Sequence, residues 1–330
     1  MRIVNLCLIL LFPLLSMIAC APSGSFKITA LPADQTVQEQ VVYKAPWTVS
    51  DRVVLIDVSG VLMNGAMPRL LSEGENPVAF TVERLDAAAK DPRVKAVVFR
   101  VNSPGGSVTA SDVLYQEVLE FKKKTKKPVI AYFQDVAASG AYYLACACDE
   151  IDAQRTCVTG SIGVIMQTVD LTGSMNKLGI TADAIKSGPY KDAGSPLRPM
   201  KNEERAVFQG IVDGMYQQFL EVVQAGRPKL SREQITKLAD GRVYTAQQAL
   251  ESGLIDRICT LSEALDTAKQ RAGINEAQVV IYHRPQDWKP NIYAQGQGGP
   301  MGQTINLLNI NMPGNWTKHP IFMYIWNAEG

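Results

Sequence analysis

Apolar and polar positions along the chain form blocks that predict the strands and helices of an α/β domain. Residues 52–58 predict a strand, and residues 94–101 predict a second, valine-rich strand that is apolar on both faces. Strands of this second kind occur in parallel sheets that helices cover on both sides. Between the two, residues 77–90 carry apolar side chains at helical spacing, from Val78 to Ala89. This order is that of a β-α-β unit.

The same alternation continues toward the C-terminus. We expect further helices at 107–124, 139–146, 201–225, 231–238, 246–251 and 261–271, and further strands at 128–133 and 278–283. Shorter segments at 164–169, 171–178 and 182–186 continue the alternation. The repeated order predicts one right-handed α/β core domain over residues 51–272.

The chain outside this domain predicts an export signal, a linker and an extension. Residues 1–19 combine Arg2 with an apolar stretch too short to favour a spanning helix. Cys20 follows Ser-Met-Ile-Ala, which resembles a bacterial lipoprotein processing site, although Ala19-Cys20-Ala21 also fits an ordinary A-x-A cleavage site. Either alternative places the protein outside the cytoplasm. Residues 20–50 are expected to form a linker without a core of its own.

Residues 273–330 are an extension without a recognised role. It ends in an aromatic cluster made of Trp316, Phe322, Tyr324 and Trp326. This apolar end could dock on the domain, on another subunit or on a membrane, and the sequence does not choose among the three.

Charge and cysteine content exclude several kinds of site. The formal net charge of +1 gives no support to nucleic-acid binding. The lysines of residues 122–127 suit the end of a helix better than an anionic partner. Four cysteines remain after processing, without C-x-x-C spacing, so no zinc site is expected. Their disulfide state stays open, with Cys148–Cys157 as one conceivable bridge; the four are Cys146, Cys148, Cys157 and Cys259.

Two loops at strand ends carry residues suited to catalysis. Ser139 lies at a strand-to-helix turn, where it could be a nucleophile or an ordinary N-cap. The loop at residues 102–107 contains Gly105 and Gly106, whose backbone freedom lets amides point at one anionic oxygen. It could equally be a plain tight turn, and its spacing fits neither a dinucleotide fingerprint nor a P-loop.

A serine nucleophile needs a general base, and histidine is a poor candidate here. The two histidines, His283 and His319, lie in the C-terminal part of the chain, and no G-x-S-x-G motif is present. The alternative is a lysine that burial keeps neutral. Lys191, in the segment 187–194, is the candidate.

Four motifs in one order carry a resemblance. They are Asn-Ser-Pro-Gly-Gly at 102–106, Ala-Ser-Gly-Ala-Tyr-Tyr at 138–143, Thr-Gly-Ser-Ile-Gly-Val at 159–164 and Ser-Gly-x-Tyr-Lys-Asp at 187–192. In this order and spacing the chain resembles the bacterial signal peptide peptidase A family of the serine–lysine type, in its short single-copy form. The resemblance implies the fold of the Clp proteases and crotonases, built from stacked ββα units.

The resemblance also implies roles for individual residues. Ser139 matches the nucleophile, Lys191 the general base, and Ser161 the hydroxyl that orients the lysine. Gly106 matches the oxyanion-hole donor, with Gly105 as a further candidate. Since a carboxylate would hold the lysine protonated, we expect the neighbouring Asp192 side chain to point away.

The function implied is a membrane-associated serine endopeptidase that cleaves hydrophobic peptides, such as remnant signal peptides, without a metal or other cofactor. Relatives of the short form resemble homo-oligomeric rings in which neighbouring subunits share each site, and a lipid anchor would hold the ring at the bacterial cell envelope. Two alternatives of the same fold stay open: a catalytically inactive peptide-binding scaffold and a crotonase-like acyl-CoA enzyme.

Overall fold

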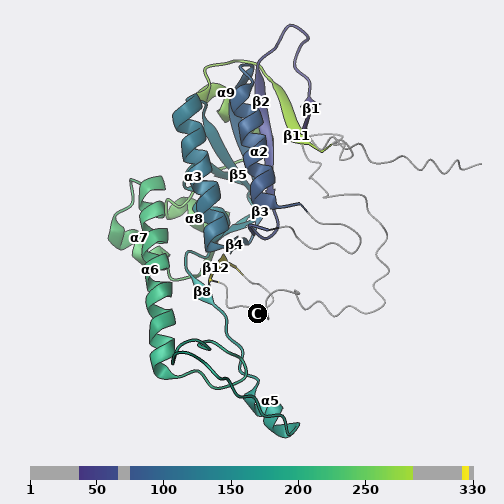
Figure 1. Ribbon diagram of the computed structural model, residues 1–330. Coiled ribbons are helices and arrows are strands. Elements are labelled where there is room, and N and C mark those ends of the chain that lie inside the picture. The colour runs from purple at the N-terminus through teal and green to yellow at the C-terminus, as the bar shows by residue number, and fades with distance from the viewer. Residues whose placement is uncertain (1–36, 66–74, 285–321, 327–330) are drawn as a thin grey trace, which may run out of the picture. The chain divides into compact units, whose positions relative to one another are not determined.

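A central, mostly parallel β-sheet organises the chain. The computed structural model describes residues 37–65, 75–284 and 322–326 (Figure 1). Within these residues the sheet has nine strands, with the core order β1-β11-β2-β3-β5-β6-β10, and β7 and β9 continue from β5. The strands are β1 (Gln38–Tyr43), β2 (Arg52–Ser59), β3 (Val94–Ser103), β5 (Val129–Ala138), β6 (Glu150–Ala153), β7 (Val158–Gly160), β9 (Val243–Thr245), β10 (Arg257–Ile258) and β11 (Gln278–His283).

Helices cover both faces of this sheet, as its apolar strands require. On one face, α2 (Pro77–Lys90), α3 (Val108–Thr125) and α4 (Gly140–Ala145) pack against alternate residues of β2 and β3, such as Val54 and Val97. On the other face, α9 (Leu261–Arg271) packs on the intervening residues, such as Val53 and Ala96. The expected α/β class and the helices at 77–90, 246–251 (α8) and 261–271 are confirmed.

The sheet extends beyond the expected domain on both sides. β11 lies at residues 278–283, as expected for a strand, and pairs in parallel with β2. β1 pairs antiparallel with β11, so residues 38–43 belong to the sheet and not to a linker. The sequence of β1, Gln-Glu-Gln-Val-Val-Tyr, gives little signal because an outer strand is only partly buried. The signal segment and Cys20 lie outside the described residues.

The segment between residues 164 and 200 departs most from expectation. Only β8 (Ile165–Met166) and α5 (Thr172–Lys177) are regular, and residues 182–186 form neither strand nor helix. We call residues 167–200 the arm. Its apolar side chains are exposed, Leu178 by 74% and Ile185 completely. β8 and α5 lie within the expected segments 164–169 and 171–178, whereas the expected element at 182–186 is absent. Apolar periodicity indicates burial without saying which chain provides the cover.

The arm leads into a long helix that shares this property. α6 (Asn202–Gly226) buries Phe219, Leu220 and Val223 near its C-terminal end, whereas Val207 and Ile211 in its first half are exposed. It is followed by α7 (Arg232–Leu238). The arm and the first half of α6 therefore expose apolar side chains to solvent in the single chain.

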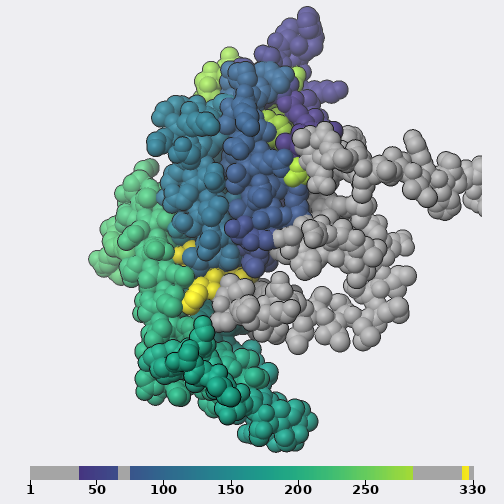
Figure 2. Space-filling model, in the orientation of Figure 1, coloured from purple at the N-terminus to yellow at the C-terminus, as the bar shows by residue number. Residues whose placement is uncertain are grey.

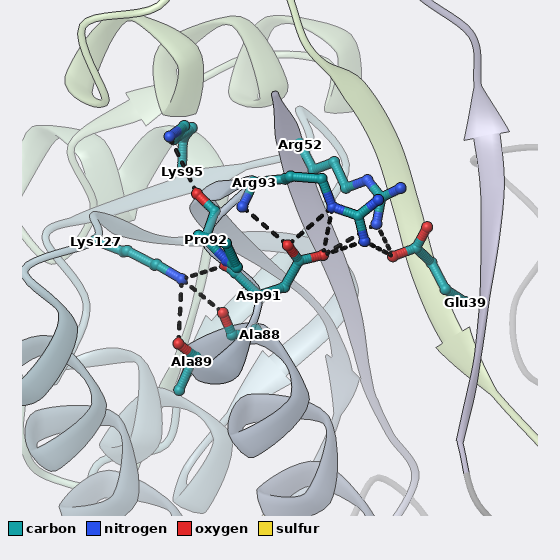
Figure 3. Close-up of polar contacts among 9 residues, drawn as sticks. All are labelled: Glu39, Arg52, Ala88, Ala89, Asp91, Pro92, Arg93, Lys95 and Lys127. Carbon is teal, nitrogen blue, oxygen red and sulfur yellow. Dashed lines mark hydrogen bonds and ion pairs between the residues drawn. The ribbon is translucent and has the colours of Figure 1, made fainter. Parts of the chain in front are cut away.

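A cluster of polar side chains lies at the end of the sheet where the parallel strands begin (Figure 3). The Asp91 carboxylate accepts hydrogen bonds from Arg93 and, at 3.0 Å, from Arg52, which also pairs with Glu39 of β1. Lys127 donates to the Ala88 carbonyl at 2.7 Å and to the Asp91 carbonyl, so it caps the C-terminal end of α2. The cluster thereby joins β1, β2, α2 and the start of β5.

Asp91→Ala should lower the free energy of unfolding by about 1–3 kcal/mol at neutral pH, because it leaves the largely buried Arg52 short of a partner. Hydrogen bonding from Arg93 lowers the pKa of Asp91 below its ordinary value of 3.8. The stabilisation is therefore present above that pH and is lost as the pH falls through the lower pKa of the folded state.

Urea unfolding followed by tryptophan fluorescence, at fixed protein concentration, measures this effect at pH 7 and at pH 3. Glu233→Ala is the matched control, since its partner Lys237 is 73% exposed and their pair should contribute less than about 0.5 kcal/mol. An equal loss for Asp91→Ala at both pH values would contradict the assignment.

Candidate active site

Ser139 occupies a strained position between β5 and α4. Its φ angle is +53°, a conformation that side-chain-bearing residues rarely adopt. The surrounding structure holds it there, because the Ser139 amide donates to the Gly160 carbonyl at 2.7 Å and the Ser139 carbonyl accepts from Tyr143 at 2.9 Å. Strain of this kind costs of order 1–3 kcal/mol and is concentrated at functional sites.

The Ser139 side chain is buried without a hydrogen-bond partner. The residue is 1% exposed, and its Oγ atom makes no hydrogen bond to any described residue. It does not cap α4, so the ordinary N-cap interpretation is wrong. A buried hydroxyl without a partner among the described residues costs about 1–3 kcal/mol.

The glycine loop after β3 shapes the other side of the site. The loop contains the short strand β4 (Gly105–Ser107). The Leu62 amide donates to the Gly105 carbonyl and the Ser107 amide donates to the Leu62 carbonyl, both at 2.8 Å. The Gly105 amide donates to Ser103 Oγ at 3.1 Å, so it is already engaged. Since successive residues of a strand face opposite sides, Gly106 directs its amide away from Leu62. A Cβ on Gly106 would lie 1.9 Å from the Leu62 carbonyl oxygen, so only glycine fits there.

Two backbone amides meet beside Ser139. A Cβ on Gly140 would lie 3.2 Å from the Gly106 nitrogen, and a Cβ on Gly105 would lie 2.6 Å from the Gly140 nitrogen. The amides of Gly106 and Gly140 are therefore neighbours, as the donors of an oxyanion hole must be. Sequence reasoning missed Gly140, although its position directly after the expected nucleophile was a usable signal.

Ser161 directly follows β7, the strand that pairs with β5 just before Ser139. β5 and β7 pair in parallel with Ala138 opposite Gly160, so the residues that follow, Ser139 and Ser161, leave the sheet side by side. Ser161 also has a positive φ, +49°, and its amide donates to the Arg242 carbonyl at 2.8 Å. It is 7% exposed. Its expected role, orienting Lys191 through its hydroxyl, stays a prediction.

Lys191 lies on the arm and does not reach Ser139 of its own chain. Its side chain is exposed and makes no hydrogen bond to a described residue, whereas Ser139 is buried. The Asp192 carboxylate accepts hydrogen bonds from Lys186 at 2.5 Å and from Arg198 at 2.8 Å. It forms none with the Lys191 side chain, in line with the expectation that it points away from Lys191. Hydrogen bonds, above all from Arg198, lower the pKa of Asp192.

Among the described residues, no other nucleophile or base forms a hydrogen bond to the Ser139 hydroxyl. The four cysteines of the described residues are free thiols, and burial raises the pKa of Cys146 and of Cys157 to about 12. The His283 ring contacts the Arg284 carbonyl, and His319 lies outside the described residues. Within residues 37–65, 75–284 and 322–326, no group of three metal-ligating side chains is found. None of the helices in these ranges is both long and apolar enough to cross a membrane.

Comparison with known proteins agrees with this geometry. Residues 121–275 match the model of peptidase family S49. A protein named "Putative signal peptide peptidase SppA" from Enterococcus faecium is 34% identical over 310 residues, which cover 92% of this chain and 86% of that protein. A protein of Methanocaldococcus jannaschii, described as a putative protease, is 40% identical over 203 residues, covering 62% of this chain.

The chloroplastic serine protease SPPA of Arabidopsis thaliana is 33% identical over 256 residues, covering 74% of this chain. The matched region spans 64% of the Methanocaldococcus protein and 37% of the Arabidopsis protein. The large, mostly parallel sheet with one core domain fits the Clp-protease-like fold expected from the resemblance. The chain belongs to peptidase family S49, the signal peptide peptidase A family of serine peptidases.

Proposed function

We propose that the chain is a serine endopeptidase in which Ser139 is the nucleophile and Lys191 of a neighbouring subunit is the general base. The observation that carries the proposal is the strained, buried Ser139 hydroxyl, which has no partner among the described residues of its own chain. A binding scaffold without activity would gain nothing from the cost of that arrangement. Family membership supports the same reaction class.

The reaction follows from the groups around Ser139. The neutral Lys191 amine takes the Ser139 hydroxyl proton while Oγ attacks the carbonyl carbon of a peptide bond. The amides of Gly106 and Gly140 stabilise the oxyanion that forms. The lysine then gives its proton to the leaving amine, which departs and leaves an acyl ester on Ser139. In the second half, the lysine takes a proton from water as the water attacks this ester, and it returns the proton to the Ser139 oxygen as the acid product leaves. Ser161 would orient the lysine through its hydroxyl.

A shared site explains why the two halves of the dyad are apart in one chain. The arm exposes apolar side chains, such as Leu178 and Ile185, to solvent. A second copy of the chain would bury them and would bring Lys191 of the first copy to Ser139 of the second. Head-to-tail contacts of this kind close into a ring, which can enclose a peptide that one small domain cannot.

The substrates proposed are hydrophobic peptides, including remnant signal peptides. An extended peptide can pair with β4 in place of β12 (Phe322–Ile325), the strand that pairs with β4 in this structure, and apolar pockets would select its side chains. The signal segment and Cys20 support export and a lipid anchor at the cell envelope, and both rest on the sequence alone.

A fluorophosphonate probe tests the proposed nucleophile. Folded protein should become phosphonylated, and peptide mass mapping should place the adduct on Ser139. Ser139→Ala and urea-unfolded protein, treated in parallel, should both stay unlabelled, because the reaction needs an activated hydroxyl in a formed site. An adduct on another serine, or none on the folded oligomer, would contradict the proposal and favour the inactive scaffold.

A further inference from the structure

The residue that follows the proposed general base carries a negative charge. Asp192 comes directly after Lys191, and the turn that holds both is tight, since the Lys191 amide donates to the Gly188 carbonyl at 3.2 Å. A carboxylate within a few ångströms of an amine favours the protonated form of the amine, whereas a general base must be neutral to accept a proton. A lysine base at this position therefore requires that the charge of Asp192 be cancelled.

Arg198 holds the Asp192 carboxylate by both of its oxygens. Its Nε atom donates to one oxygen and its Nη2 atom to the other, both at 2.8 Å, and Nη2 also donates to the Asp192 carbonyl at 3.2 Å. The Lys186 ammonium pairs with the same carboxylate at 2.5 Å. A two-oxygen contact with a guanidinium fixes the plane of a carboxylate as well as compensating its charge.

Arg198 also ties this turn to α6. Its two terminal nitrogens donate to the two oxygens of Glu204, at 3.0 and 2.6 Å. The Glu204 side chain is 1% exposed and accepts from the Lys201 amide at 3.1 Å, so it caps the start of the helix. Figure 2 shows the teal arm against the green α6. Asp192, and with it the neighbouring Lys191, is thus anchored to a long helix.

The charges in this network balance. Three cations and three anions accompany Lys191 in residues 186–198 and the first turn of α6 with its cap: Lys186, Arg198 and Lys201 against Asp192, Glu203 and Glu204. Hydrogen bonding to Asp192 raises the pKa of Arg198, and hydrogen bonding from Arg198 lowers the pKa of Glu204. Beside Ser161, Arg242 and Asp240 pair with each other at 2.5 Å. Loss of the Arg198 charge would therefore leave one carboxylate uncompensated in the turn that holds Lys191.

We infer that Arg198 is a positioning residue for Lys191, which holds the Asp192 carboxylate away from the amine and cancels its charge. The inference rests on the proposed function for the role of Lys191 as base, whereas the effect of Arg198 on the protonation of Lys191 does not depend on that role. Without Arg198, the free carboxylate stabilises the ammonium form, and activity moves to higher pH. Without Asp192, the cations remain, and activity moves to lower pH.

The pH dependence of peptide hydrolysis tests the inference. The protein is the full-chain oligomer, the substrate is a fluorogenic hydrophobic peptide, and kcat/KM is measured from about pH 6 to about pH 10. Arg198→Gln should move the midpoint of the rising limb up by about 0.5–1 pH unit, which lowers kcat/KM at neutral pH roughly three- to tenfold. Asp192→Asn should move the midpoint down by a similar amount.

The double variant separates charge from structure. Asp192→Asn/Arg198→Gln removes both charges, so its midpoint should return to within about 0.2 pH unit of that of the unmodified enzyme. Arg198→Lys keeps the cation without the two-oxygen contact and should keep the midpoint while kcat falls. Arg205→Gln, at an exposed arginine one residue after Glu204, is the matched control and should keep the midpoint and kcat. An unchanged midpoint in Arg198→Gln, or an equally raised one in the double variant, would overturn the inference.

A second measurement follows Lys191 without catalysis. The Ser139→Ala oligomer is treated with a trace of acetic anhydride at each pH, and mass spectrometry gives the fraction of Lys191 that is acetylated. Because only the neutral amine reacts, the midpoint of labelling reports the protonation of Lys191. Adding Arg198→Gln should raise this midpoint, and adding Asp192→Asn should lower it. An unchanged midpoint with Asp192→Asn would overturn the inference even where Arg198→Gln does not assemble.

The two measurements also separate this inference from the proposed function. If the labelling midpoints move as expected while Lys191→Ala keeps its activity, the proposed dyad fails and the effect of Arg198 on Lys191 stands. If Lys191→Ala is inactive while neither the activity midpoint nor the labelling midpoint moves, the dyad stands and the role of Arg198 fails.

Discussion

Replacing Lys191 with alanine should lower kcat for a hydrophobic peptide on the order of a thousandfold or more, with little change in stability. Without the amine, nothing in the proposed site removes the Ser139 proton. The fold should survive because Lys191 is exposed and makes no hydrogen bond to a described residue. Far-UV circular dichroism and the elution volume of the oligomer check this second expectation.

Lys191→Arg separates charge from basicity. A guanidinium stays protonated, so this variant should be as inactive as Lys191→Ala although it keeps the positive charge. Since only the neutral amine accepts a proton, the unmodified enzyme should gain activity as the pH rises toward the alkaline range. Lys177→Ala, at an exposed lysine of the same arm, is the matched control and should keep full activity. An acid pH optimum, or more than about a tenth of the activity in Lys191→Ala, would contradict the assigned base.

The central sheet could be predicted from the sequence because its strands carry their own evidence. β3 is buried almost throughout, and its apolar residues point to both faces of the sheet, interrupted only by Lys95 and Arg100 before Asn102. The helix over residues 77–90 was predicted to the residue, since Asn76 caps its start and Pro77 follows at the first position. The glycine loop could also be predicted, because it directly follows the predicted strand at 94–101. Ser139 follows the predicted strand at 128–133, which in the structure continues to Ala138.

The arm and β12 could not be predicted, for a different physical reason. Ile185 and Leu178 have the periodicity of buried residues, yet no described part of their own chain covers them. β12 has four residues and pairs with strands more than 150 positions earlier in the chain, so local pattern could not reveal its partners. The role of Gly140 was also not predicted, because it depends on Gly106, a residue of another strand, lying next to it.

Mixing two inactive proteins should restore activity if neighbouring subunits share each site. Ser139→Ala chains keep Lys191, and Lys191→Ala chains keep Ser139. After dissociation, mixing in equal amounts and reassembly, about a quarter of the interfaces should join an intact serine to an intact lysine. The mixture should then show about a quarter of the activity of unmodified protein that was reassembled in the same way. This effect is large because each parent is expected to be on the order of a thousandfold less active.

Two controls define that comparison. Ser139→Ala mixed with the double variant Ser139→Ala/Lys191→Ala contains no intact serine and should stay inactive. The same two inactive parents mixed without dissociation should gain activity only as fast as subunits exchange. Both controls pass through the same handling, so a gain confined to the complementary mixture reports on site sharing.

Peptide hydrolysis by this reassembled mixture tests the central claim most directly, because it requires Ser139 and Lys191 to act together and to come from different chains. The account predicts a return to about a quarter of the activity of the unmodified oligomer. Mixed oligomers that form, as shown by differently tagged subunits eluting together, and yet stay inactive would contradict the shared site.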